Sequence, residues 1–403
     1  MNDRFQVMKK LFAKKIVSIV LAFSCVCGAS LWAQAADEEY DEFDDFDSIF
    51  DDAGEDIEVE QSAPAVVPAA TSSSGIVFTG HFSGDIGLSA VIIEKPDLGG
   101  YISLDNTLYM TVRPAPVVSI NGAINTSLSN KFSIGLSYLY FDYMLFDRVF
   151  ISAGKKSVSW GYTRLFGNGN VMADTNGQLN AEIRFPWSTG TATFVGAYNY
   201  AALSSSPSYK DITYALSIEQ TVLHTSVNLF AKKYGQSETS DGVHKHPLAG
   251  LEIKRTIVGY DIYAQGVTRL ADYKKLNSKN GYECVTATTG FYKLWDGFDP
   301  NLGINIEYQY NWTPSVASGS SPHNHKIMLQ GGIKRIGKNK NMKGGVDWNH
   351  NFSGNDGNVT AAFIIDGILP YASWKNAVSV DYGPSVEKTK FTIGSVISLS
   401  LDY

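Results

Sequence analysis

An alternation of apolar and polar residues with a period of two constrains this chain more than any other feature. In NLGINIEYQYNW, residues 301–312, apolar or aromatic side chains stand at every second position from Leu302 to Trp312, with small or polar ones between them. Successive side chains of a β-strand point to opposite faces, so the segment predicts a strand with one apolar and one polar face. About ten residues is also the length at which a tilted strand crosses a bilayer.

Segments of the same kind recur from Gly75 to the C-terminus, and turn-forming residues separate them. Examples are YISLDNTLYMTVR at 101–113, QLNAEIRF at 178–185, TIVGYDIYAQG at 256–266 and FTIGSVISLSLDY at 391–403. No amphipathic helical stretch of useful length interrupts them. The body of the chain is therefore predicted to be all-β.

The links between these segments alternate in length. Short links follow the even-numbered candidate strands, at 114–116, 145–148, 187–189 and 337–340. Longer links follow the odd-numbered ones, at 161–177, 201–210, 236–245, 271–281 and 313–322. Such alternation is typical of a transmembrane antiparallel up-and-down β-barrel. We predict a single barrel of 16 to 18 strands, the range reflecting a short link at 130–131 that breaks the alternation.

A soluble β-sandwich is the alternative all-β architecture. A sandwich of this length normally divides into two or three domains, and no boundary is visible after residue 75. Tryptophans near the ends of the candidate strands favour the barrel, because interfacial girdles of aromatic residues lie there. These tryptophans are Trp160, Trp187, Trp295, Trp312, Trp348 and Trp374.

The N-terminal residues divide into two further parts. Residues 1–36 have the basic start, the apolar run and the Ala-Gln-Ala site of a cleaved secretory signal peptide. Residues 37–60 hold fourteen carboxylates and no Lys or Arg, and a Pro/Ala/Ser linker extends to residue 74. Self-repulsion predicts a disordered tail over 37–74, free as a tether or inserted into the lumen as a plug. The barrel then spans 75–403.

The charge balance changes once these parts are separated. The whole chain carries a net charge of −7; residues 1–36 contribute +4 and residues 37–60 contribute −14, which leaves +3 for the remainder. This nearly neutral body shows no basic stripe and no nucleic-acid motif, so no nucleic-acid partner is expected. Cys25 and Cys27 lie in the signal peptide, and Cys284 alone in the mature chain excludes an internal disulfide.

The last strand carries a family resemblance. Ile397, Leu399, Leu401 and the C-terminal Tyr403 alternate on one face. This ending resembles the porin-like outer-membrane β-barrel superfamily of Gram-negative bacteria and spirochaetes, whose final strand the barrel assembly machinery recognises; Ser398 replaces a glycine of the stricter signal. The resemblance implies a diderm bacterium, an outer-membrane location with a periplasmic N-terminal tail, and contacts with outer-membrane lipids. A homotrimer is compatible with it.

The size of the barrel predicts a function. Eight strands are filled by their own side chains, whereas sixteen to eighteen leave an aqueous channel. We expect a channel for passive diffusion of small hydrophilic solutes, with mixed charges that favour polar solutes without strong ion selectivity. The candidate pore-lining residues are Asp105, Arg113, Glu182, Arg184, Lys232, Glu252, Lys254, Asp261, Glu307, Lys334, Asp347 and Asp381.

The longest link suited to the interior is GYTRLFGNGNVMADTNG at 161–177. The preceding SAGKKSVSWG resembles a segment, Gly-Arg-Gln followed by Trp-Gly, found in many porin-like barrels; Lys155 and Lys156 replace the Arg and Gln. In general porins the third external loop folds inward and narrows the barrel. If this link does the same, Arg164 and Asp174 are the constriction candidates. An ordinary surface loop is the alternative.

Two rival functions remain open: a structural or adhesive barrel with a closed lumen, and a barrel-embedded hydrolase. A hydrolase needs His beside Ser and a carboxylate or amide, and no Ser motif accompanies the histidines. The pairs 244/246 and 323/325 lie about four strands apart, roughly 19 Å, so they do not predict a joint metal site. We expect no enzyme, catalytic residue, metal or cofactor. The histidines are His81, His224, His244, His246, His323, His325 and His350.

Overall fold

The fold is described from a computed structural model. It covers residues 75–403 apart from 94–95, 168–169, 176, 199–208, 236–238, 241–242, 245, 277, 297–299, 315–320, 385 and 387–388. The predicted signal peptide at 1–36 and the acidic tail with its linker at 37–74 lie outside the described residues.

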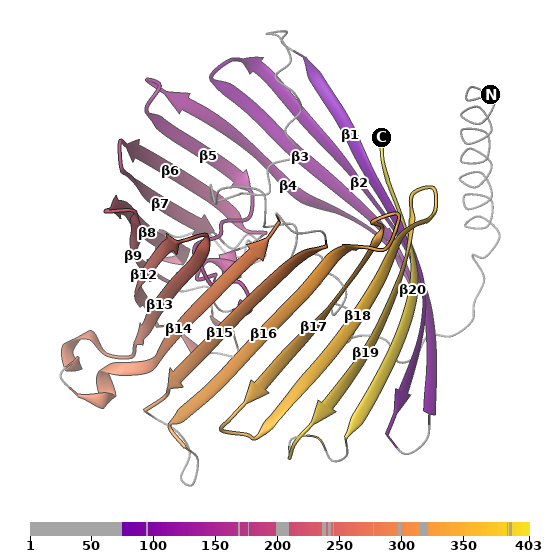
Figure 1. Ribbon diagram of the computed structural model, residues 1–403. Coiled ribbons are helices and arrows are strands. Elements are labelled where there is room, and N and C mark those ends of the chain that lie inside the picture. Colours follow the sequence, from indigo (N-terminus) through magenta and orange to yellow (C-terminus); the bar gives the residue numbers. More distant parts are fainter. Residues whose placement is uncertain are drawn as a thin grey trace.

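Eighteen antiparallel strands form one closed sheet. Each strand pairs with its neighbour along the chain, and β1 pairs with both β2 and β20, so the sheet closes into a barrel (Figure 1). The strands of the barrel are β1 (Ile76–Ile92), β2 (Pro96–Ala115), β3 (Val118–Leu128), β4 (Phe132–Leu145), β5 (Val149–Lys155), β6 (Leu179–Trp187), β7 (Gly190–Tyr198), β8 (Ile212–Val222), β9 (Thr225–Lys233), β12 (Leu248–Ile257), β13 (Tyr260–Leu270), β14 (Tyr282–Trp295), β15 (Asn301–Trp312), β16 (His323–Ile336), β17 (Met342–Asn351), β18 (Asp356–Leu369), β19 (Ala372–Tyr382) and β20 (Lys390–Asp402).

The remaining elements among the described residues are small and lie in the links. β10 (Thr239–Ser240) and β11 (Val243–His244) form a separate two-stranded ribbon. The short 3-10 helices in the described part of the chain are η3 (Ala173–Thr175), η5 (Tyr209–Asp211), η6 (Tyr273–Lys275) and η7 (Lys279–Gly281). Among the described residues, no helix is long and apolar enough to cross a membrane.

The two ends of the barrel differ in the length of their links. At one end, here called the turn end, the strands are joined by short turns at 116–117, 146–148, 188–189, 223–224, 258–259 and 370–371. At the other end, the loop end, links such as 156–178, 271–281 and 313–322 are longer. The short link at 129–131 joins two paired strands, β3 and β4, which settles the strand number at eighteen within the predicted range. In Figure 1 the C-terminus marks the turn end, at the top.

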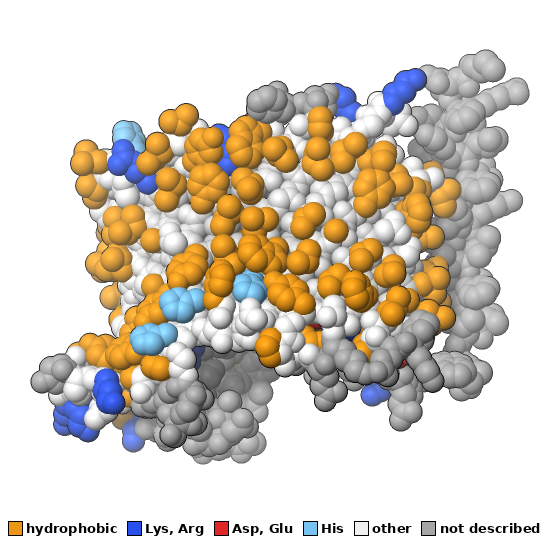
Figure 2. Space-filling view, turned by 60° about the horizontal axis from the view of Figure 1, so that its bottom comes forward, with side chains coloured by type: hydrophobic (Ala, Val, Ile, Leu, Met, Phe, Trp, Pro, Cys, Tyr) orange, Lys and Arg blue, Asp and Glu red, His pale blue; other side chains and the backbone are white. Residues whose placement is uncertain are grey.

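The inner face of the barrel is polar and its outer face is apolar. On β15, Asn305, Glu307 and Gln309 are 3%, 0% and 2% exposed, whereas Leu302 on the opposite face is 46% exposed. Figure 2 shows hydrophobic side chains spread over the outer wall. A soluble protein buries apolar side chains, so this reversed arrangement identifies a membrane-spanning barrel. The predicted lipid-facing and lumen-facing positions of segment 301–312 are confirmed.

Aromatic residues gather at strand ends, with one exception to the prediction. Trp187 and Trp374 are 37% and 41% exposed near the ends of β6 and β19. Trp312 closes β15 at its loop end and packs on Tyr282, with ring centroids 6.0 Å apart. Trp160 was expected in a girdle, and this was wrong: it lies in the link after β5, 8% exposed, in a buried cluster. The link carries it inside the barrel, away from lipid.

The C-terminal residue completes the closure between β20 and β1. The backbone N–H of Tyr403 donates to Gly80 O at 2.9 Å, and the N–H of Gly80 donates to Tyr403 O at 2.8 Å. The Tyr403 hydroxyl donates to Oδ1 of Asn106 on β2 at 2.8 Å. A Cβ at Gly80 would come within 2.1 Å of the Tyr403 ring, so a larger residue there would displace this ring.

Candidate functional site

Residues 156–178, here called the inner loop, link β5 to β6 and fold into the barrel. Val158, Trp160 and Met172 of the loop are 3%, 8% and 0% exposed, and they pack in one cluster with Phe230 of β9 and Tyr234 just after it. Apolar burial therefore fixes one side of the loop against the inner wall. Of the two predicted alternatives, the inward-folded loop is the one that the structure shows.

Two buried carboxylates on the wall hold the backbone of the inner loop. Glu307 of β15 is fully buried and accepts hydrogen bonds from the N–H of Arg164, from the N–H of Phe166 at 3.0 Å and from the hydroxyl of Tyr263 at 2.6 Å. Charge-assisted hydrogen bonds of this kind are the stronger ones. The loop N–H groups thus find partners that the lumen wall supplies.

Glu252 of β12 makes the second anchor. It is also fully buried and accepts from the N–H of Tyr162 at 3.1 Å, from Nδ2 of Asn228 at 3.0 Å and from Nε2 of Gln265 at 2.5 Å. The Tyr162 hydroxyl donates to Oε1 of Glu219 on β8 at 2.6 Å. Burial, and then the hydrogen bond to Glu219, raise the pKa of the Tyr162 phenol above its ordinary value.

The start of the inner loop is fixed by a buried ion pair. Lys156 Nζ lies 2.6 Å from Oε2 of Glu182 on β6, and both side chains are 3% exposed. Lys156 also donates to Oγ of Ser152 at 2.9 Å, and Arg184 pairs with Oε1 of Glu182 at 2.9 Å. Because a buried charge is costly without a partner, this pair resists separation.

The predicted constriction residue Arg164 lies against the wall of β13 and β14. Its guanidinium is 3.6 Å from Oδ2 of Asp261 and 4.1 Å from the centre of the Tyr292 ring. Lys254 Nζ lies 3.3 Å from the same Asp261 oxygen. For Asp174, the structure places the backbone in η3, while its side chain is outside the described part of the chain.

Nine of the twelve predicted pore-lining residues fall into two groups, and the other three, Arg184, Lys254 and Asp261, are the partly exposed ion-pair partners described above. Glu182, Lys232, Glu252 and Glu307 point inward but are at most 3% exposed. They touch the inner loop: Lys232 Nζ, for example, donates to the carbonyl of Val171 at 3.1 Å. These four groups hold the loop, and burial keeps them from open water.

The second group lies on β2, β16, β17 and β19. Asp105, Lys334 and Asp347 are partly exposed, and Arg113 is exposed. Asp381 accepts from Nδ2 of Asn358 at 2.5 Å and lies 4.0 Å from Nζ of Lys390. That these residues line the pore and meet a passing solute stays a prediction.

Three contributors to the site were missed in the sequence. Tyr162, Glu219 and Tyr263 supply hydrogen bonds around the inner loop. Alternation along the strands predicts that Glu219 and Tyr263 face inward. Their neighbours Ile218 and Ile262 are indeed exposed on the outer face. No local signal pairs them with the loop, since the pairing depends on the fold.

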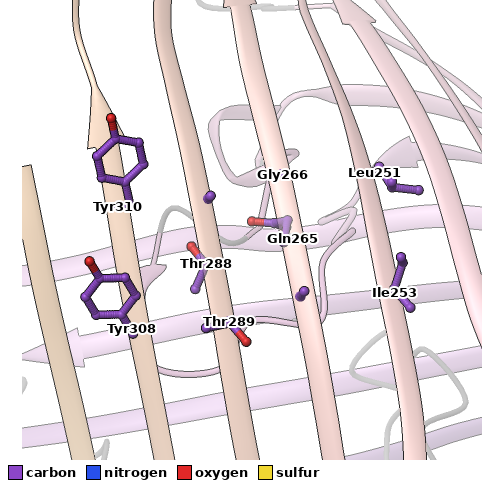
Figure 3. Close-up of a pocket in the computed structure, with 10 residues that line it drawn as sticks. Leu251, Ile253, Gln265, Gly266, Thr288, Thr289, Tyr308 and Tyr310 are labelled. Atoms are coloured by element: carbon purple, nitrogen blue, oxygen red, sulfur yellow. The ribbon is translucent and has the colours of Figure 1, made fainter. Parts of the chain in front are cut away.

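A groove on the outer wall is distinct from the lumen. It encloses about 320 Å³ over β12–β15, and Figure 3 shows Leu251 and Ile253 on one side of it and Tyr308 and Tyr310 on the other. Outward-facing Ala264, Gly266, Ala287 and Thr289 form its floor. This groove faces lipid and does not belong to a path for solutes.

Outward-facing histidines border that groove. Nδ1 of His323 is 2.7 Å from the Tyr310 hydroxyl, and Nδ1 of His325 is 2.5 Å from the Tyr308 hydroxyl. Within the described residues, no three His, Cys, Asp or Glu side chains gather as a metal site would require.

Comparison with known proteins supports the fold. No protein-family model matches the chain, and no curated protein matches it by sequence. Among solved structures, OccK11 (OpdR) of Pseudomonas aeruginosa superposes with a TM-score of 0.53 at 7% identity, covering 81% of this chain and 96% of that one. OccD3 (OpdP) of the same organism gives 0.51 at 9% identity, with 82% and 93% covered. OpdK of Pseudomonas aeruginosa, solved with vanillate, gives 0.51 at 8% identity, with 81% and 99% covered.

These similarities show that the chain has the fold of porin-like outer-membrane β-barrels. The predicted up-and-down β-barrel architecture is confirmed, and the predicted resemblance to porin-like barrels holds at the level of the fold.

Proposed function

From this fold, we propose that the protein is an outer-membrane channel for passive diffusion of small hydrophilic solutes, narrowed by its inner loop. One observation carries the proposal. Buried inward charges gather where the inner loop contacts β6, β9, β12 and β15, whereas inward residues on β2 and β17 keep contact with solvent. An aqueous path between the inner loop and the wall formed by β2 and β17 would keep these inward residues in contact with solvent.

The charges along that path support polar solutes. Arg164 is held at the loop by Asp261 and the Tyr292 ring, while Asp347 and Asp381 stand on β17 and β19. Opposed charges across a pore order water and favour polar molecules over apolar ones. We assign Arg164 to the constriction, with Asp174 as its candidate acidic counterpart.

The proposed channel needs no catalytic activity. We also propose the partners that the resemblance implies. These are outer-membrane lipids, the barrel assembly machinery and a homotrimer. A structural or adhesive barrel with a closed lumen is the rival function, and the following measurement separates the two.

The test is single-channel conductance of the refolded chain in a planar bilayer. We expect discrete, stable steps, and a larger conductance or altered ion selectivity in Arg164→Ala. Arg148→Ala is the matched control, because Arg148 lies exposed in a turn at 146–148 and its removal deletes the same charge outside the lumen. Absence of steps from a barrel that keeps its heat-modifiable gel mobility would refute the channel and favour the rival.

A further inference from the structure

The hairpin that joins β16 to β17 concentrates positive charge at the turn end. Five cations lie within residues 334–343, and residues 331–346 contain no Asp or Glu. Three of the five are exposed around the turn at 337–341. We call this segment the basic hairpin; its cations are Lys334, Arg335, Lys338, Lys340 and Lys343.

The strand register extends this charge along the inner wall. Lys334 stands directly opposite Lys343, and Ile364 of β18 lies between Lys343 and Lys375 in the same cross-strand row. Val346 and Trp374 face outward and are 44% and 41% exposed. Because side chains alternate between the two faces of a strand, Lys343 and Lys375 face inward. Asp366 accompanies Lys343 at 3.8 Å and offsets one charge of the row. The row therefore presents a net positive surface just inside the mouth of the lumen.

The acidic part of this chain is tethered at the same end of the barrel. β1 begins at Ile76 at the turn end, and in the sheet β20, β19, β18 and β17 lie between β1 and β16. At about 4.8 Å per strand, the basic hairpin lies roughly 19 to 24 Å from the start of β1. A flexible chain as long as residues 61–75, which are rich in Pro, Ala and Ser, would span roughly 20 Å. Residues 37–60 thus have the reach.

We infer that the acidic segment 37–60 of this chain binds the basic hairpin and the lysine row beside it. Fourteen carboxylates without a single Lys or Arg complement the five hairpin cations and Lys375. The short linker makes the encounter intramolecular, with an effective concentration in the millimolar range. Anionic lipid is the other ligand with this charge, but Lys334, Lys343 and Lys375 face the inside of the barrel, where lipid outside the wall does not reach them.

Binding of this kind places carboxylates at the turn-end mouth of the lumen. The contact is electrostatic and solvent-exposed, so salt weakens it strongly. It does not depend on whether the lumen conducts ions, because it concerns only the tail and the mouth.

The test is zero-length carbodiimide cross-linking of the full mature chain in neutral detergent, with the linked peptides identified by mass spectrometry. Between about 0.05 M and 1 M NaCl, we expect links from residues 37–60 to the hairpin lysines to fall roughly tenfold. Lys338→Gln with Lys340→Gln should reduce the remaining links to Lys334 and Lys343, because neutralising the turn weakens binding of the whole segment. Lys274→Gln with Lys275→Gln, at the loop end, is the matched control and should leave them unchanged.

Each alternative result has a defined meaning. Links spread evenly over loop-end lysines, or an absence of links at low salt, would overturn the inference. A mixture of isotopically light and heavy chains tests whether the tail binds the hairpin of its own chain. Links that join a light chain to a heavy chain would show binding between two copies and would overturn the inference. If vesicles of anionic lipid remove the links while vesicles of neutral lipid do not, lipid is the preferred ligand and the inference fails. Unchanged heat-modifiable mobility shows that each variant is folded.

Discussion

Glu307 offers the sharpest perturbation of the inner loop. Its carboxylate accepts two backbone N–H bonds from the loop, at Arg164 and Phe166, and one hydroxyl bond from Tyr263 on the wall. Glu307→Ala removes all three and leaves the docked loop with two unpaired N–H groups. Undocking lets water satisfy those groups, so the substitution shifts the loop toward the undocked state.

The size of this shift follows from the bonds that are lost. A hydrogen bond to a charged acceptor contributes about 1.5 to 3 kcal/mol, so the two loop bonds together contribute about 3 to 6 kcal/mol. At 1.4 kcal/mol per factor of ten, the undocked population rises roughly a hundred-fold or more. Glu307→Gln keeps one acceptor oxygen without its charge, and we expect an intermediate effect.

Limited trypsin digestion measures the undocked population, because the chain carries its own cleavage site at Arg164. The Arg164 side chain is 12% exposed in the docked loop, so cleavage after it requires undocking. We expect cleavage to accelerate in the order wild type, Glu307→Gln, Glu307→Ala. Asp105→Ala is the control: Asp105 is another inward carboxylate, on β2, and it makes no described contact with the inner loop. Equal cleavage of Glu307→Ala and wild type, or equal acceleration by Asp105→Ala, would refute the anchoring argument.

Three further predictions concern closure, the buried ion pair and alkaline pH. Gly80→Val should impair barrel closure, because its side chain meets the ring of Tyr403; loss of heat-modifiable gel mobility reports this, and a normally closed barrel would contradict it. Lys156→Met should destabilise the barrel by about 3 to 5 kcal/mol by leaving Glu182 poorly compensated, and adding Glu182→Gln should restore part of the loss; urea midpoints measure both. The raised pKa of Tyr162 means that its hydrogen bond contributes fully below pH 10.0, the ordinary value, and is lost only as pH rises through the higher folded value. Difference titration of tyrosinate absorbance against Tyr162→Phe should show no ionisation of this phenol at pH 10.0, and normal ionisation there would contradict the burial.

Alternation and link length were readable from the sequence because both are local. The side-chain period of a strand depends only on the backbone, so the outward position of Leu302 and the inward position of Glu307 follow from their spacing. Long and short links likewise set the up-and-down order of the strands. The barrel class and the inward or outward direction of each strand residue were therefore predictable. The link that enters the lumen was identified as a candidate, but its inward folding was one of two alternatives.

Only the tertiary structure decided which inward groups meet. Tyr162 reaches Glu252 across 90 residues of sequence, and Arg164 reaches Glu307 across 143. Closure of the sheet and its register determine those distances, and neither leaves a mark in the local pattern. For the same reason Glu252 and Glu307, expected to line open water, are instead covered by the loop that they hold, and Trp160 lies inside the barrel. Sequence alone thus determined which face each residue occupies, while the closed barrel decided its neighbours.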